Sequence, residues 1–160
     1  MKTNLRGFSL IELLIVVAII LIIAAIAIPN FLRSRIAANQ ASAAQSLRSL
    51  NTAETTYAST YGSGFTSALA VLGPPTGGNP PSTAAADLID NVLAGGTKSG
   101  YNFVYAPGAQ DPQGNYLGFT VNANPITPGM TGSSYYFTDQ SYVIRSNSTG
   151  TASASDSPIS

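Results

Sequence analysis

Hydrophobic positions gather at one end of the chain. Residues 13–28 are sixteen consecutive apolar positions without a charge, and residues 8–28 make up a segment of 21. A helix of that length rises about 31 Å, which is about the thickness of a bilayer core. The pattern therefore predicts a transmembrane half of a helix over 8–28, followed by a polar chain rich in Gly, Ser, Thr and Pro.

Helical spacing continues beyond this apolar run. Pro29 has no backbone donor and clashes with the preceding turn, so we expect a helix kink there. Over residues 29–61 the apolar positions form one stripe, which predicts an amphipathic half that packs on a globular head. The stripe consists of Ile36, Ala43, Leu50 and Tyr57, with Leu32, Leu47 and Tyr61 beside them. Gly62 is the expected stop of the helix.

One small head cannot cover a helix of this length. From Phe8 to Tyr61 the helix would contain 54 residues and rise about 80 Å. We therefore expect most of one side of the helix to be covered by other copies of the chain.

Residues 62–148 predict a globular α/β head. Pro and Gly dominate residues 62–82, which we interpret as a loop region with one short turn at 67–72. Residues 84–94 predict a short helix, because four apolar side chains share one face and Gly95 and Gly96 follow it. Ser82 or Thr83 is the expected cap of this helix.

The last third of the chain is strand-like. Four segments rich in aromatic and β-branched residues alternate with turn residues: 101–106, 116–122, 134–138 and 142–146. They predict a small four-stranded antiparallel sheet on the amphipathic half of the helix, hence an α+β fold. Residues 149–160 are rich in Ser and Thr and predict a flexible tail.

Composition restricts the chemistry that this chain can perform. It has seven basic and seven acidic residues, no Cys and no His. Disulfides, Cys/His zinc sites, catalytic thiols and serine–histidine triads are therefore excluded. A net charge of zero argues against a nucleic-acid partner. We expect no enzymatic activity, no cofactor and no metal.

The polar residues of the head admit simple structural interpretations. No carboxylates lie side by side as a general acid–base pair, and no run of oxygen ligands resembles a calcium loop. Asp111 and Asp139 stand in turn sequences and are interpreted as turn formers. Asn147-Ser148-Thr149 matches the glycosylation sequon, a three-residue pattern that often arises by chance.

The apolar run admits three interpretations. A secretory signal peptide would use Lys2 and Arg6 as its basic region and Ala25-Ile26-Ala27 as its cleavage site. A plain membrane anchor would keep the same two cations on the cytoplasmic side. Glu12 is not explained by the anchor and interrupts the signal peptide, since a carboxylate within a span is costly and by default functional.

The third interpretation rests on a motif at the start of the run, Arg6-Gly7-Phe8-Ser9-Leu10-Ile11-Glu12-Leu13. With the basic leader before it and Pro29 after the run, this stretch resembles the class III signal peptide of type IV prepilins. The resemblance covers residues 1–61 well and the remainder in outline. It implies that residues 1–7 are a leader, that a prepilin peptidase and methyltransferase cuts between Gly7 and Phe8, and that Phe8 becomes N-methylated. Glu12 would pair with the Phe8 amine of a neighbouring subunit during assembly.

The resemblance also implies a pilin fold and a structural role. The protein would wait in the inner membrane as a single-pass precursor, in contact with lipid and with the pilus or secretion assembly machinery. Copies of itself and other pilins would then join through the N-terminal helix into a type IV pilus on the cell surface. The alternatives are a pseudopilin in a periplasmic pseudopilus of type II secretion and a membrane-tethered monomeric binding domain.

Overall fold

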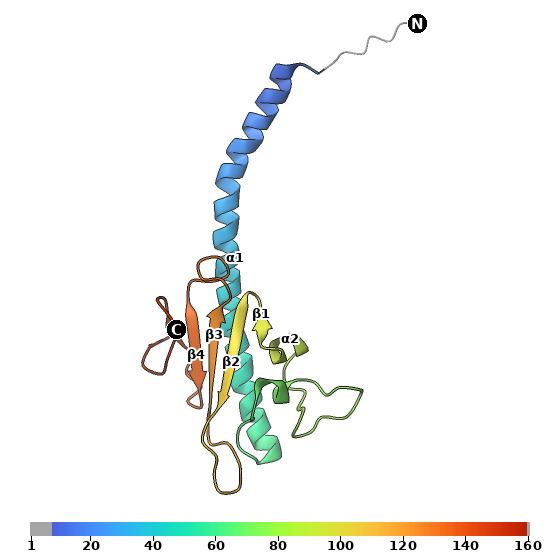
Figure 1. Ribbon diagram of the computed structural model, residues 1–160, viewed down its shortest axis with the longest axis vertical. Helices are drawn as coiled ribbons and strands as arrows, with labels where there is room; N and C mark the ends of the chain where they lie inside the picture. Colours follow the sequence, from blue (N-terminus) through green and yellow to red (C-terminus); the bar gives the residue numbers. More distant parts are fainter. Residues whose placement is uncertain (1–7, 160) are drawn as a thin grey trace. The chain divides into compact units, whose positions relative to one another are not determined.

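The computed structural model of the protein describes residues 8–159 (Figure 1). The predicted leader, including Gly7 of the expected cleavage site, lies outside the described residues. The chain divides into two compact units at Arg35 and Ile36. Helix α1 (Leu10–Tyr61) contributes its first part to one unit and its last part to the other.

The first unit consists of the apolar part of α1. Its large apolar side chains, from Phe8 to Leu32, are between 46% and 79% exposed. The helix is uninterrupted at Pro29, and the kink that we expect there stays a prediction. Within the described residues, α1 is the one helix long and apolar enough to cross a membrane, although an N-terminal signal sequence would meet the same criterion.

The second unit contains an antiparallel sheet whose strands follow one another in chain order. The strands are β1 (Thr97–Lys98), β2 (Tyr101–Pro107), β3 (Phe119–Pro125), β4 (Tyr135–Asp139), β5 (Arg145–Asn147) and β6 (Ser157–Pro158). The predicted α+β fold is confirmed, with six strands rather than four. β1 and β6 were missed because two residues are too few for an alternating pattern to appear.

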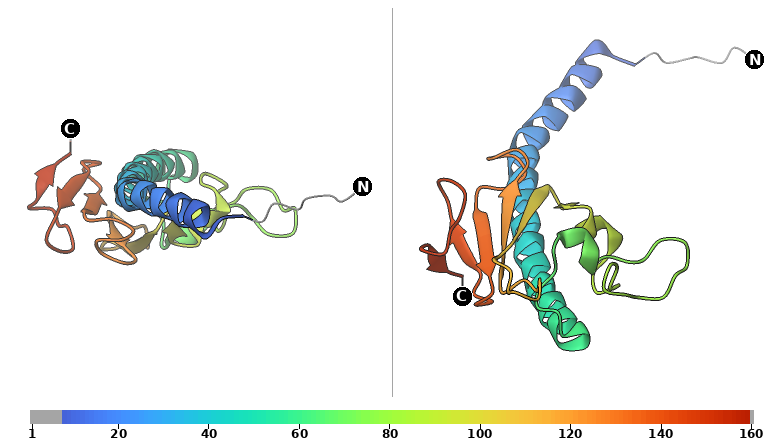
Figure 2. Two further views of the ribbon diagram at one scale, coloured as in Figure 1. Left: turned by 90° about the horizontal axis from the view of Figure 1, so that it is seen from above. Right: turned by 60° about the horizontal axis from the view of Figure 1, so that its bottom comes forward.

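The core of this unit lies between the sheet and the last half of α1 (Figures 1 and 2). Side chains alternate along β3, so that Phe119, Val121 and Ala123 are buried against the helix. The predicted stripe is confirmed at its centre, where Ala43, Leu47, Leu50 and Tyr57 are all buried. At its ends Ile36 and Tyr61 are half-buried, and Leu32 is exposed.

β3 and β5 each begin three residues later than predicted, because a residue in each segment adopts another role. Tyr116 bridges to the segment after α1, where its carbonyl accepts the N–H of Phe65 at 3.0 Å, and β3 starts only at Phe119. Tyr142 has a positive φ of 61°, which is incompatible with a strand, so β5 starts at Arg145. The helix stop is confirmed: Gly62 has a φ of 63° and its N–H donates to the Ala58 carbonyl.

The short helix is much shorter than predicted. It is α2 (Asn91–Ala94), and its cap is Asp90, which accepts the N–H of Leu93 at 3.0 Å, rather than Ser82 or Thr83. Asp87 has a left-handed φ of 55°. The neighbouring amide groups of Ala86 and Leu88 donate to carbonyls of the 3-10 helix η1 (Leu69–Leu72) instead of continuing a helix.

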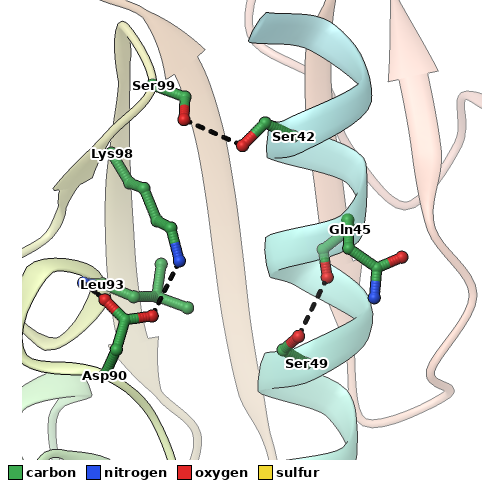
Figure 3. Close-up of polar contacts among 7 residues, drawn as sticks. All are labelled: Ser42, Gln45, Ser49, Asp90, Leu93, Lys98 and Ser99. Atoms are coloured by element: carbon green, nitrogen blue, oxygen red, sulfur yellow. Dashed lines mark hydrogen bonds and ion pairs between the residues drawn. The ribbon is translucent and has the colours of Figure 1, made fainter. Parts of the chain in front are cut away.

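Polar contacts join the cap of α2 to β1, and the residue after β1 to α1 (Figure 3). Lys98 Nζ lies 2.7 Å from Asp90 Oδ2, so the cap of α2 is also an ion pair. Ser42 on α1 donates to Ser99 Oγ at 2.8 Å, and Ser99 follows β1 directly. These exposed contacts lie at the β1 edge of the sheet.

The C-terminal segment, expected to be a flexible tail, is folded in the structure. Ala152 is buried, and its carbonyl accepts a hydrogen bond from Asn122 Nδ2 at 2.7 Å. Asp156 accepts from Asn147 Nδ2 at 2.9 Å, and its backbone carbonyl accepts from Arg145. Composition suggested disorder because apolar residues are few, whereas specific polar contacts hold this segment.

Candidate assembly and processing site

The start of α1 brings two of the predicted functional positions, Phe8 and Glu12, into one short segment. Phe8 is 77% exposed and lies before the helix. Ser9 immediately precedes the first helical residue, Leu10, and therefore occupies the N-cap position. Its backbone N–H donates to Glu12 Oε2 at 2.9 Å.

This contact is the glutamate half of a capping box. Ser9 and Glu12 have the Ser-x-x-Glu spacing of such a box, so the sequence already contains the signal for this contact. The negative carboxylate also lies at the positive end of the helix macrodipole, which stabilises it there. The backbone N–H of Ser9 thus holds the Glu12 carboxylate at the end of the helix.

The geometry leaves the carboxylate of Glu12 available for a second interaction. A carboxylate has about four acceptor positions, and one of them receives Ser9. Phe8 is only four residues before Glu12 in the chain, so both positions lie at the same end of the helix. Pro29 lies seventeen residues beyond Glu12, about 25 Å along the helix, and is not part of this site.

The exposed apolar surface of the first unit must be shielded from water by other molecules. Monomeric proteins in water rarely expose contiguous apolar patches above a few hundred Å². Here every large apolar side chain from Phe8 to Leu32 is about half exposed or more. Lipid or other protein chains must therefore surround this part of α1.

The carboxylates predicted to form turns in the head do so. Asp111 accepts from the backbone and side chain of Asn115 and from the N–H of Gln113, at 2.8 to 3.0 Å. The Asn115 N–H contributes most to lowering the pKa of the Asp111 carboxyl. Asp139 accepts from the N–H of Ser141 at 2.9 Å. These are local turn contacts that need no ligand to explain them.

The amide of Asn147 also has a structural role. Its oxygen accepts from the N–H of Thr149 at 2.8 Å, and its nitrogen donates to Asp156. A sugar on this nitrogen would disturb the fold of the C-terminal segment, which agrees with a chance match to the sequon.

Three polar residues of α1 that the sequence did not predict as part of the core are buried: Ser46, Asn51 and Glu54. Asn51, which is not among the apolar residues of the predicted stripe, is buried and donates to the Tyr142 carbonyl at 3.1 Å. Glu54 is fully buried, and burial is the main reason why its pKa is raised. Glu54 lies four residues after Leu50 and three before Tyr57, so it shares their face of the helix. This spacing is the sequence signal that could have predicted its burial.

Comparison with known proteins connects the N-terminal segment to a family. Residues 2–28 match the prokaryotic N-terminal methylation motif. The chain is 54% identical over 52 residues to the type IV major pilin protein PilA of Myxococcus xanthus, a match that covers 32% of this chain and 24% of the relative. It is 64% identical over 36 residues to the type IV wide pilus major component PilA4 of Thermus thermophilus, covering 22% and 28%.

The matches have a limited extent. The chain spans about a quarter of the length of each of these two curated relatives. No solved structure matches the chain significantly. The similarity therefore concerns the N-terminal segment and leaves the head to be interpreted from its own residues.

Proposed function

Because the N-terminal segment of this chain is that of a type IV pilin, we propose that the protein is a structural subunit of a type IV pilus. The observation that carries the proposal is the methylation motif at residues 2–28 directly before an exposed apolar helix. The motif provides for processing, and the exposed helix provides the surface through which copies join. The role is structural rather than enzymatic.

Processing precedes assembly in this proposal. A prepilin peptidase cuts between Gly7 and Phe8 while the apolar part of α1 holds the chain in the inner membrane. The cut lies before the apolar run, so the mature subunit keeps its helix. Phe8 becomes the new N-terminus and is N-methylated. The inner-membrane machinery then transfers the subunit from lipid into a surface filament.

Glu12 is the proposed assembly residue. An unpaired carboxylate is costly in an apolar surrounding, and pairing with a cation removes much of this cost. The Phe8 amine of a neighbouring subunit, displaced along the axis by about one helix turn, supplies that cation. The Ser9 N–H keeps the carboxylate at the helix end, where such an amine can reach it. The pair sets an axial register that an apolar surface alone does not define.

Mass spectrometry tests the processing step. The mature protein should begin at N-methylated Phe8, and Gly7→Leu should leave the uncut precursor in the membrane. A chain that begins near Ile28, or an uncut Met1 in wild-type cells, contradicts the proposal. The first result would identify an ordinary signal peptide and the second an ordinary membrane anchor.

Glu12→Ala tests the assembly step. The variant should reach normal levels of cleaved protein but form few or no filaments, as counted by electron microscopy of sheared cell-surface material. Glu12→Gln keeps the shape and the polar contact and should fail less completely. Asp87→Asn, which removes the charge of an exposed carboxylate of the head and tolerates the left-handed φ at this position, is the matched control and should assemble normally. Filaments in normal number from Glu12→Ala would refute the pairing role.

Deletion of the gene separates a pilus from a secretion pseudopilus. A pilus subunit predicts loss of surface filaments with normal export of enzymes into the medium. Normal filaments with lost export would instead identify a type II pseudopilin. Normal filaments with normal export would identify a tethered monomer.

A further inference from the structure

A buried carboxyl group joins three parts of the head. Glu54 of α1 is fully buried, and Thr66, in the segment after the helix, contacts it twice. The Thr66 N–H donates to Glu54 Oε2 at 3.1 Å, and Thr66 Oγ1 lies 2.5 Å from Glu54 Oε1. Tyr105 of β2 closes the group: its hydroxyl lies 3.0 Å from Thr66 Oγ1 and donates to the Thr66 carbonyl at 2.9 Å.

The number of protons available for hydrogen bonds in this cluster depends on whether Glu54 is ionised or neutral. Three oxygen–oxygen contacts follow one another: Glu54 to Thr66 Oγ1, Thr66 Oγ1 to Tyr105, and Tyr105 to the Thr66 carbonyl. Each hydroxyl carries one proton, and an ionised carboxylate carries none. With an ionised Glu54, two protons must serve three contacts, so one contact brings two oxygens together without a hydrogen bond. A protonated Glu54 supplies the third proton and satisfies all three contacts.

We propose that Glu54 is a neutral carboxylic acid in the folded head at neutral pH, and that its proton completes a hydrogen-bonded latch. The Glu54 hydroxyl donates to Thr66 Oγ1, which donates to Tyr105, which donates to the Thr66 carbonyl. The Thr66 N–H donates back to the second oxygen of Glu54. The latch ties the segment after α1 to the helix and to β2. It concerns the head alone and does not depend on filament formation.

The surroundings favour the neutral form. Loss of water on burial is the largest influence on Glu54 and raises its pKa, against a smaller lowering by the hydrogen bonds of Thr66 and Tyr105. The titratable groups facing the cluster are Tyr105 of β2 and, beyond it, Tyr116, and burial raises the pKa of Tyr105 as well. No cation is among the groups acting on Glu54 in the described residues. A buried carboxylate without a cation is costly, and protonation removes the charge.

The latch has a structural consequence beyond Thr66. Two residues earlier, Gly64 packs so closely on the backbone of Tyr116 that it leaves no room for a side chain, and Phe65 donates to the Tyr116 carbonyl. Residues 64–66 therefore connect α1 to the β2–β3 connection. Since the pKa of Glu54 is raised in the folded state, the stabilisation is complete below the unfolded pKa and is lost as pH rises through the folded pKa. Alkaline conditions should loosen this region first.

Hydrogen exchange of the full-length chain in detergent micelles tests the latch. The protection factor of the peptide containing the Thr66 amide, corrected for the intrinsic pH dependence of exchange, should fall about tenfold as Glu54 ionises. One oxygen–oxygen contact of the latch then lacks its proton, and local opening, which returns the carboxylate to water, becomes easier. Glu54→Gln should abolish this fall, because its amide donates to Thr66 Oγ1 and its carbonyl accepts the Thr66 N–H. Asp87→Asn, which neutralises an exposed carboxylate, should behave as wild type. Equal falls in wild type and Glu54→Gln, or no fall in wild type, would overturn the proposal.

Infrared spectroscopy gives a second readout that does not require Glu54→Gln to fold. The wild-type chain at pH 7 should show the C=O stretch of a protonated carboxylic acid. Glu12 is the other glutamate, so Glu12→Gln is the control, and the band should persist in it. Absence of the band, or its loss in Glu12→Gln, would show that Glu54 is ionised.

Discussion

We predict that residues 36–160 fold without the first unit. The reason is the distribution of buried side chains: in the described chain, every buried residue lies at Ala43 or later. Removal of residues 1–35 therefore takes no side chain out of the core. It also removes the apolar surface that would make the chain aggregate in water.

The structure allows the cost of this truncation to be estimated. The shortened helix begins with new unpaired N–H groups and without a capping residue, which costs about 1 kcal/mol. Domains of this size have free energies of unfolding of about 5–15 kcal/mol. The fragment should therefore retain most of its stability and unfold in one cooperative transition.

Urea denaturation followed by circular dichroism, with size-exclusion chromatography, provides the measurement. A fragment of residues 51–160 is the matched control, because it lacks Ala43, Leu47 and Leu50, which are each fully buried. Loss of the two leucines alone removes about 4–10 kcal/mol, at about 2–5 kcal/mol for each truncated side chain. This control should show no cooperative transition. Aggregation of the 36–160 fragment, or the same gradual unfolding as the control, would refute our reasoning.

Three further predictions concern the head. Gly132→Ala should destabilise it by about 1–3 kcal/mol, because the new Cβ would lie 2.6 Å from Cζ of the buried Tyr101 ring, and an unchanged urea midpoint would contradict this packing. Asp156→Ala should speed proteolysis of the C-terminal segment and leave the core intact, and unchanged cleavage would mean that its contacts do not hold the segment. The Lys98 ion pair and the Leu93 N–H lower the pKa of Asp90, so its stabilisation is present above the unfolded pKa and declines as pH falls through the folded value. Asp90→Asn should weaken this acid dependence, but because the pair is exposed the loss should stay below about 1 kcal/mol and shrink in salt.

The sequence alone was sufficient to predict those features whose signal comes from residues close together in the chain. Sixteen successive apolar residues predict a span whatever surrounds them, and the motif at Gly7, Phe8 and Glu12 lies within six residues. The stripe over Ala43 to Tyr57 and the stop at Gly62 follow from the helical period and from backbone freedom. Each depends on neighbours in the chain, so each could be predicted without knowledge of the fold.

Tertiary contacts decided the rest. β1 and β6 are strands only because β2 and β5 supply hydrogen bonds, and two residues carry no pattern of their own. The C-terminal segment is ordered by Asn147 and Asp156, nine residues apart and polar, where composition suggested disorder. Glu54 shares the stripe with Leu50 and Tyr57, but only its meeting with Thr66 and Tyr105 reveals why a carboxyl group can be buried there. Hydrophobic periodicity determined which side of α1 faces the core. The fold brings polar partners from distant parts of the chain to that side, and these partners determine which hydrogen bonds its buried polar residues form.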